Sequence, residues 1–195
     1  MKLPSLQIMD EFVDIPPVFY SFYEEGPFSN CIACDISLLD NNVPYVIEKA
    51  FKKDEVIFEY AMCLKCLEKF QRSFSLESKL VIDQFFGSRV DLAKRRSVLL
   101  SDNANKFNAD AWLSRCILTD QCLGQIEERQ IFGQFQGDKL LFSYLPFMIN
   151  KTALEPIYEK MSTKTKDEND RFVTDYLNKL PDFSDLSPHP PLMVM

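Results

Sequence analysis

Four cysteines in two C-x₂-C pairs are the residues best suited to chemistry in this sequence. Cys31 pairs with Cys34, and Cys63 pairs with Cys66. A thiolate is a metal ligand, and two residues between paired cysteines allow a tight turn that directs both sulfurs toward one point. We therefore expect a structural Zn²⁺ held by all four, since no position remains open for water. Iron accepts similar ligands, as a single ion or a cluster, and is the alternative.

The segment between the two pairs indicates how they are brought together. It spans residues 35–62, and two β-like runs within it, Val43–Phe51 and Glu55–Met62, predict a hairpin. After the second pair, apolar residues recur at helical spacing, so this pair should open a helix. A helix N-terminus suits thiolates, because its partial positive charge and free N–H groups stabilise them. The helical residues are Leu67, Phe70 and Phe74.

We call the tight turn that carries Cys31 and Cys34 the knuckle. The order of knuckle, hairpin and ligand-bearing helix resembles the treble-clef class of zinc fingers. The resemblance covers about residues 31–75 and is carried by layout and ligand spacing alone. It implies a closed Cys₄ unit stabilised by zinc. A thioredoxin-like redox motif is a weaker interpretation, because it requires only one C-x₂-C pair after a strand.

The remaining chain predicts an α+β fold around this unit. Residues 1–30 are expected to be an N-terminal arm, 76–114 a helical segment, 115–183 a second hairpin-plus-helix unit, and 184–195 a tail. Ser75 and Asn108 are candidate helix N-caps, and Thr165 with Glu168 has the pattern of a capping box. The predicted elements are a helix over Val90–Leu100, strands Ile131–Phe135 and Leu140–Leu145, and helices Ala153–Met161 and Lys166–Leu180.

The second hairpin resembles the first when the sequence is shifted by 84 residues. Five identities result: Ile47/Ile131, Phe51/Phe135, Asp54/Asp138, Phe58/Phe142 and Tyr60/Tyr144. The same shift places Phe147 and Asn150 opposite Cys63 and Cys66, and Leu118 opposite Cys34. One hypothesis is a degenerate repeat that has lost its ligands. The alternative is that two amphipathic hairpins in a Phe-rich chain share residues by chance.

Cys116 and Cys122 lie in this second unit. Two thiols cannot complete a tetrahedral site, so we interpret them as ordinary buried cysteines or as remnants of a second knuckle. A redox-sensitive pair is the alternative.

Composition bounds the possible partners and compartment. The net charge of −7 disfavours nucleic acid, although Arg89, Lys94, Arg95 and Arg96 could form one basic face. The sequence has no apolar run of about 18 residues, so no membrane span is expected. The start, Met1-Lys2-Leu3-Pro4, has no secretory pattern, and we expect the cytoplasm, where thiols stay reduced.

The sequence offers little support for a catalytic site. His189 is the single histidine and stands among prolines in the tail, while the acidic pairs are adjacent along the chain and cannot face each other across a substrate. We therefore expect a non-enzymatic, zinc-stabilised module that binds another protein. The alternatives are a nucleic-acid-binding regulator and a thiol redox sensor that uses Cys116 and Cys122.

Overall fold

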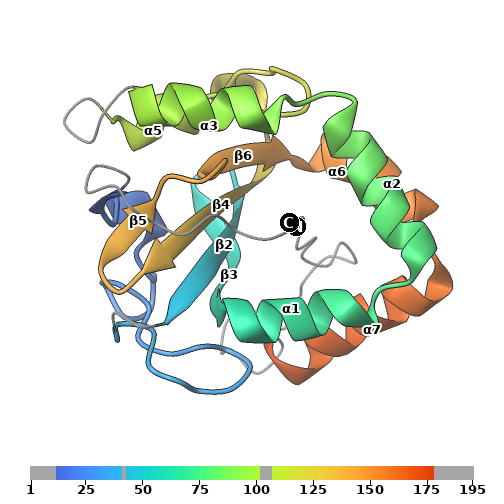
Figure 1. The fold of residues 1–195 in the computed structure, drawn as a ribbon, viewed down its shortest axis with the longest axis horizontal. Helices are drawn as coiled ribbons and strands as arrows, with labels where there is room; N and C mark the ends of the chain where they lie inside the picture. The colour runs from blue at the N-terminus through green and yellow to red at the C-terminus, as the bar shows by residue number, and fades with distance from the viewer. Residues whose placement is uncertain (1–11, 41–42, 102–106, 178–195) are drawn as a thin grey trace.

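The fold is α+β and is built on one antiparallel sheet (Figure 1). The computed structural model describes residues 12–40, 43–101 and 107–177. The strand order is β1-β5-β4-β2-β3, and β6 also pairs with β4. The strands are β1 Phe12–Asp14, β2 Pro44–Lys52, β3 Glu55–Cys63, β4 Glu128–Gln136, β5 Lys139–Leu141 and β6 Phe147–Asn150.

The first predicted hairpin is confirmed. Strands β2 and β3 pair in antiparallel register from Tyr45 opposite Cys63 to Lys52 opposite Glu55, with one irregularity near Phe51. Lys53 turns the chain with a φ of 55°, a left-handed conformation that tight hairpin turns require. The hairpin therefore brings the end of β3 back to the start of β2, close to the first cysteine pair.

The second hairpin differs from the prediction in its returning strand. The expected run Leu140–Leu145 leaves the sheet after Leu141, and β6 rejoins β4 only at Phe147. Pro146 has no N–H to donate to a strand ladder, which is consistent with an interruption here. The interruption adds residues to the second hairpin that the first does not have.

Helices follow both hairpins. Ser75 and Asn108 cap their helices as predicted, but Thr165 does not begin the last helix. Ser162 is its N-cap and accepts a hydrogen bond from the backbone N–H of Thr165. Leu180, His189 and the tail 184–195 lie outside the described residues. The helices are α1 Leu64–Ser73, α2 Leu76–Gly87, α3 Leu92–Ser101, α5 Ala109–Trp112, α6 Lys151–Lys160 and α7 Thr163–Asp175, with short 3₁₀ turns η1 Pro17–Phe19 and η2 Leu123–Gln125.

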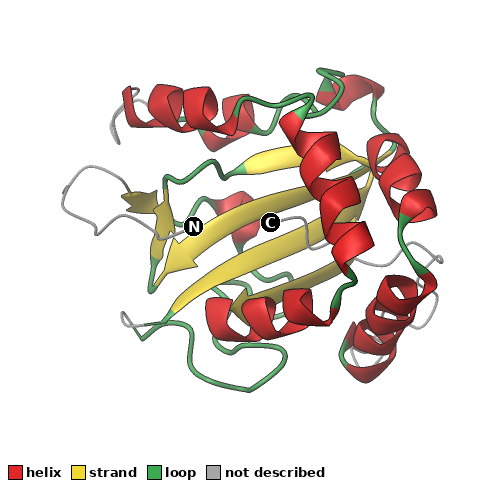
Figure 2. Ribbon diagram, turned by 45° about the vertical axis from the view of Figure 1, so that its right-hand side comes forward, coloured by secondary structure: helices red, strands yellow, loops and turns green. Residues whose placement is uncertain are grey.

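The second helix of each hairpin unit packs against the other unit (Figures 1 and 2). On α7, Phe172 contacts Tyr60 of β3 and Phe70 of α1, each with ring centroids 5.2 Å apart. On α2, Phe86 lies 6.2 Å from Phe147 of β6. These helix contacts interlock the two halves of the chain around the shared sheet.

Residues 12–30 pack against the strands through a second set of contacts. Phe19 is fully buried and packs edge-on against Phe135, with centroids 5.1 Å apart. Gly133 leaves the space for this contact, since a Cβ there would stand 3.1 Å from the Phe19 ring and 2.6 Å from that of Phe135. Along the strands, side chains alternate between faces, so one set of residues meets the helices and the other meets this segment.

Candidate metal centre

The first cysteine pair lies in a tight knuckle that precedes β2. The N–H of Asp35 donates to the carbonyl of Cys31 at 2.9 Å, and the N–H of Cys31 donates to the carbonyl of Ile36 at 2.9 Å. Asp35 has a φ of 59°, a region that Asp tolerates better than most residues. The turn is also tied to the hairpin, because the N–H of Ile32 donates to the carbonyl of Ala61 at 2.9 Å. The knuckle is thus fixed against β3.

The second pair stands where β3 becomes α1. Cys63 is the last residue of β3 and the N-cap of the helix, and Cys66 lies in the first helical turn, as predicted. The N–H of Cys63 approaches the Sγ of Cys31 at 3.4 Å. A backbone N–H directed at sulfur stabilises a thiolate, so this contact favours the charged form that a metal requires.

The structure brings all four sulfurs into one cluster. The four Sγ atoms lie within 4.8 Å of one another, and those of Cys34 and Cys63 are 3.8 Å apart. A tetrahedron with metal–sulfur bonds of about 2.3 Å has sulfur–sulfur edges of about 3.8 Å. The donor set therefore fits a thiophilic ion, and only small movements are needed to regularise it. Cys31 and Cys63 are buried, whereas Cys34 is exposed.

The thiols of the cluster influence one another's ionisation. Burial raises the pKa of Cys31 against the opposing effect of backbone N–H groups, and burial followed by hydrogen bonding with Cys34 raises the pKa of Cys66. For Cys34, burial is outweighed by the N–H of Ile36 and by the neighbouring thiols, which lower its pKa. The pKa of Cys34 is thus shifted in the direction opposite to those of Cys31 and Cys66. An ion bound here displaces protons, so its affinity falls as pH falls.

The remaining chemically active residues of the sequence lie apart from the cluster. Cys116 is buried, and its Sγ accepts the N–H of Asn150 at 3.4 Å; Cys122 is partly buried. Asn150 appears in the sequence analysis only as the residue opposite Cys66 and is given no role there. Its side chain caps α6 through the N–H of Ala153 at 2.8 Å and donates to Thr119 at 3.3 Å. An Asn just before a predicted helix is a preferred N-cap, and this is the signal that could have identified it.

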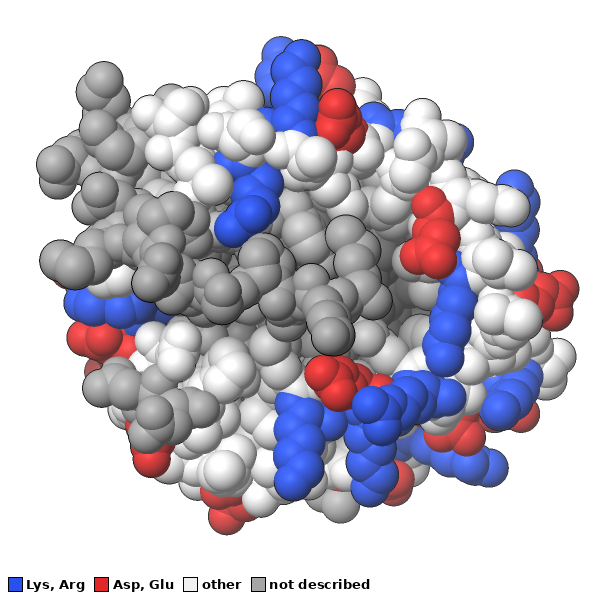
Figure 3. Space-filling view, viewed as in Figure 1, with Lys and Arg blue, Asp and Glu red and all other residues white. Residues whose placement is uncertain are grey.

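One of the four basic residues that the sequence placed on a single face, Arg95, turns inward. Its guanidinium donates to the carbonyls of Tyr144 at 3.0 Å and of Pro146, and it stacks over Trp112 at 4.6 Å. Burial lowers its pKa to about 10. Arg89 stacks over the ring of Phe85 at 3.8 Å. Figure 3 shows basic side chains interspersed with acidic ones on the face it presents.

The comparisons with known proteins identify no relative. No family model, curated protein or solved structure matches the chain. Among the helices that the structure describes, none is both long enough and apolar enough to cross a membrane.

Proposed function

We propose that this chain is a zinc-stabilised, non-catalytic module in which Cys31, Cys34, Cys63 and Cys66 hold one structural Zn²⁺. The observation that carries the proposal is the cluster of four sulfurs within 4.8 Å. Four protein ligands complete a tetrahedral site and leave no position for water or substrate, which is typical of structural rather than catalytic zinc. The sequence of knuckle, β2–β3 hairpin and α1 supports a treble-clef-like layout.

The position of the cluster also supports a structural role. A surface pocket of about 770 Å³ lies between the β1 segment and α5, and its lining includes Phe12, Pro16, Phe107, Asp110 and Lys139. None of the four cysteines lines it. The ion would instead sit between the knuckle and the first turn of α1, where it joins two backbone segments distant in sequence.

We further propose that the module acts by binding another protein. Large apolar side chains are exposed on the two loops around the first cysteine pair. Phe22 is 66% exposed and Tyr23 41% in the loop before it, while Ile36 and Leu39 are 45% and 44% exposed just after it. Exposed aromatic and aliphatic side chains are typical of protein-contact surfaces, and these two loops flank the same cysteine pair.

The two alternative functions are less well supported. The inward orientation of Arg95 removes one cation from the basic face on which a nucleic-acid regulator would depend. A peroxide-sensing thiol is usually accessible and ionised, whereas Cys116 is only 2% exposed.

Metal analysis with thiol counting tests the zinc site. We expect one zinc per chain in protein purified without chelators under reducing conditions. Four of the six thiols should be protected while the ion is bound and should become reactive after chelation. Iron in place of zinc, or no metal at all, would contradict the zinc assignment.

A binding screen tests the second part. The full-length protein and the variant Phe22→Ser with Ile36→Ser are compared in pull-down and size-exclusion experiments, with Leu80→Ser, on the exposed face of α2, as the matched control. We expect a partner that is retained by the control and lost by the double variant. Absence of any partner and of self-association would count against a binding module.

A further inference from the structure

The two halves of the chain are related by a local two-fold axis through the centre of the sheet. Strands β2 and β4 are both nine residues long, are offset by 84 residues, and pair antiparallel with Glu48 opposite Phe132. Those two residues are themselves 84 apart, so the axis passes between them. The helices continue the relationship, since α1 and α6 both have ten residues and begin 87 residues apart. Helices α2 and α7 also begin 87 residues apart.

The sequence separation between corresponding residues changes from 84 in the paired strands to 87 in the helices, and the structure shows where this change occurs. Tyr45 pairs with Cys63 at the end of β3, and Arg129, the counterpart of Tyr45, pairs with Asn150 at the end of β6. Asn150 is therefore the counterpart of Cys63. The three additional residues lie between β5 and β6, where the second hairpin leaves the sheet. A constant shift of 84, as applied to the sequence, misaligned everything beyond this point.

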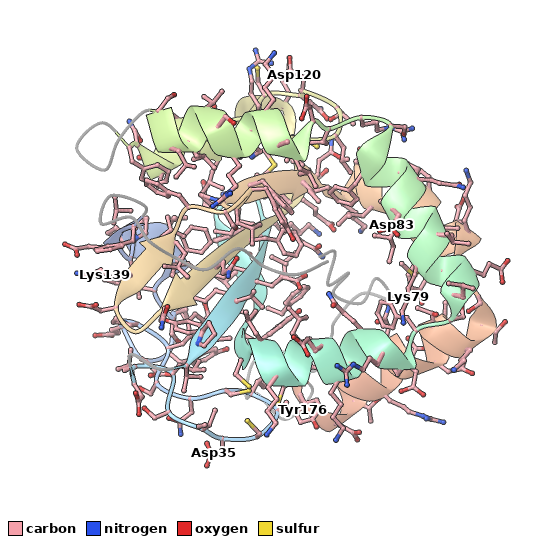
Figure 4. The ribbon with its side chains drawn as sticks, viewed as in Figure 1. Asp35, Lys79, Asp83, Asp120, Lys139 and Tyr176 are labelled. Atoms are coloured by element: carbon pink, nitrogen blue, oxygen red, sulfur yellow. The ribbon has the colours of Figure 1, made fainter. Side chains whose placement is uncertain are left out.

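The knuckle is repeated in the same hydrogen bonds. In the second half, the N–H of Asp120 donates to the carbonyl of Cys116 at 2.8 Å, and the N–H of Cys116 donates to the carbonyl of Gln121 at 2.9 Å. Ile117 donates to the carbonyl of Met148 at 2.8 Å, as Ile32 does to Ala61. The φ of Asp120 is 58°, against 59° for Asp35. In Figure 4 these two aspartates lie on opposite sides of the molecule.

The contact between backbone and sulfur is repeated as well. The N–H of Asn150 lies 3.4 Å from the Sγ of Cys116, the same distance as from the N–H of Cys63 to the Sγ of Cys31. Ser75 and Ser162, the N-caps of α2 and α7, also form equivalent hydrogen bonds with each other's helix. The N–H of Ser75 donates to Thr165 at 3.1 Å, and that of Ser162 donates to Ser78 at 3.0 Å.

We propose that the chain is a duplicated knuckle–hairpin–helix–helix unit, and that Cys116, Thr119, Asn150 and Ala153 occupy the positions of a second metal site that has lost three ligands. They correspond in order to Cys31, Cys34, Cys63 and Cys66. The lost ion is replaced by the Asn150 amide. This group donates to Thr119 and to Gln121, the latter at 2.6 Å, and accepts the N–H of Ala153.

The Asn150 amide connects the same backbone segments that a metal ion would connect. Asn150 is 2% exposed, and its backbone and side chain together contact the other three positions. It joins the second knuckle to the first turn of α6, just as the proposed zinc joins the first knuckle to α1. This inference rests on the proposed zinc site of the first half, which metal analysis of the unaltered protein tests separately.

Restoring the three ligands tests the assignment. The full-length variant Thr119→Cys, Asn150→Cys, Ala153→Cys is purified under reducing conditions and titrated with Zn²⁺. We expect two zinc ions per chain, against one for the unaltered protein. Adding Cys116→Ser removes one ligand of the new site, and its affinity for the second ion should then fall by at least tenfold.

Two results would overturn the duplication. One is a folded triple variant, with its first site filled, that still binds a single ion. The other is a second ion whose affinity does not respond to Cys116→Ser. If the unaltered protein binds no ion, the proposed zinc site fails instead, and the two failures are thereby distinguished.

If the triple variant does not fold, a single variant tests whether positions 116 and 150 correspond to Cys31 and Cys63. With Asn150→Cys alone, the sulfurs at positions 116 and 150 should be adjacent, as those of Cys31 and Cys63 are within 4.8 Å. Mild oxidation of the metal-bound protein should give a 116–150 disulfide that peptide mass mapping detects. Failure of Cys116 to pair with position 150 in this folded variant would contradict the equivalence.

Discussion

The phenolic hydroxyl of Tyr60 donates a hydrogen bond to Oε2 of Glu48 in the interior of the protein, where both residues are 1% exposed. The other oxygen, Oε1, has no hydrogen-bond partner among the described residues. Burial raises the pKa of Glu48 to about 8, and the bond from Tyr60 opposes this only in part. Glu48 is therefore largely protonated at neutral pH, which makes its burial tolerable.

Replacement of Glu48 by Gln should stabilise the protein increasingly as pH rises. The folded pKa of about 8 lies above the ordinary value of 4.5, so the native carboxyl holds its proton more tightly than the unfolded one. The unaltered protein therefore loses stability as pH rises from about 4.5 to about 8, by at most about 1.4 kcal/mol per pH unit. Glu48→Gln cannot ionise and keeps the acceptor for Tyr60. Urea unfolding between pH 5 and 8 measures the difference, and a pH-independent difference would refute the argument.

Removal of the proposed metal ion should unfold more than the turn that carries Cys31 and Cys34. Cys63 ends β3, whose partner β2 is a central strand of the sheet, so the loss of its ligand bond acts on the core of the fold. Structural zinc sites contribute on the order of 10–16 kcal/mol, comparable with a whole domain's stability of about 5–15 kcal/mol. We expect Cys63→Ser, or chelation, to abolish the cooperative melting transition seen by circular dichroism. Cys122→Ser, outside the cluster, is the control, and an unchanged melting curve after complete metal removal would contradict the structural role.

The buried ion pair of Lys49 and Glu59 should be costly to break from one side. Their Nζ and Oε2 atoms are 2.9 Å apart with side chains 5% and 1% exposed, and Glu59 also accepts the hydroxyl of Ser21 at 2.9 Å. Glu59→Gln leaves the ammonium group buried without its counter-ion, so we expect a loss of about 3–5 kcal/mol.

Two further variants separate charge from packing at this pair. Lys49→Met combined with Glu59→Gln removes both charges and should recover a large part of the loss. The exposed pair of Glu68 and Arg72 supplies the matched control, where Glu68→Gln should cost less than about 1 kcal/mol. If Glu59→Gln lowers the free energy of unfolding no more than this control does, the buried Lys49–Glu59 pair stabilises the fold no more than an exposed pair.

Asn150 variants separate capping from bridging. Asn150→Ala removes the cap of α6 and the bonds to Thr119 and Gln121, and should lower the free energy of unfolding by about 2–4 kcal/mol. Asn150→Asp keeps the cap but removes the amide donor, so its loss should be smaller. Equal losses for the two variants would show that the cap contributes nothing, and an unchanged stability of Asn150→Asp would show that the bridge to Thr119 and Gln121 contributes nothing.

Local patterns in the sequence identified most of the elements that carry the site. The spacing of the cysteine pairs, the β2–β3 hairpin and the cap at Ser75 were all predictable, because each depends on residues close together in the chain. The assignment of Thr165 as the start of α7 was wrong. Its hydroxyl accepts the N–H of Ser75, a contact across 90 residues that no local pattern encodes.

The second knuckle illustrates why the remainder was harder to predict. Its positions are held by backbone hydrogen bonds around Cys116, and backbone bonds leave little trace in side-chain identity. The interruption after Leu141 then displaced the alignment by three residues, so Asn150 was compared with Cys66 rather than with Cys63. Likewise, Arg95 reads as a surface cation in the sequence, and only the fold shows it reaching two carbonyls of a distant loop.

The cross-strand pair of Glu48 and Phe132 lies at the middle of the β2–β4 register, where each strand meets its counterpart. If two first halves paired through β2 in this register, the two Glu48 side chains would stand directly opposite each other at a buried position. Two carboxyl groups so close cannot both ionise readily, so such a pairing would become less favourable as pH rises and the carboxyls lose their protons. In the single chain, one of them is replaced by an aromatic ring. The pairing of β2 with β4 in one chain thus places a single ionisable group, rather than two, at the centre of the sheet.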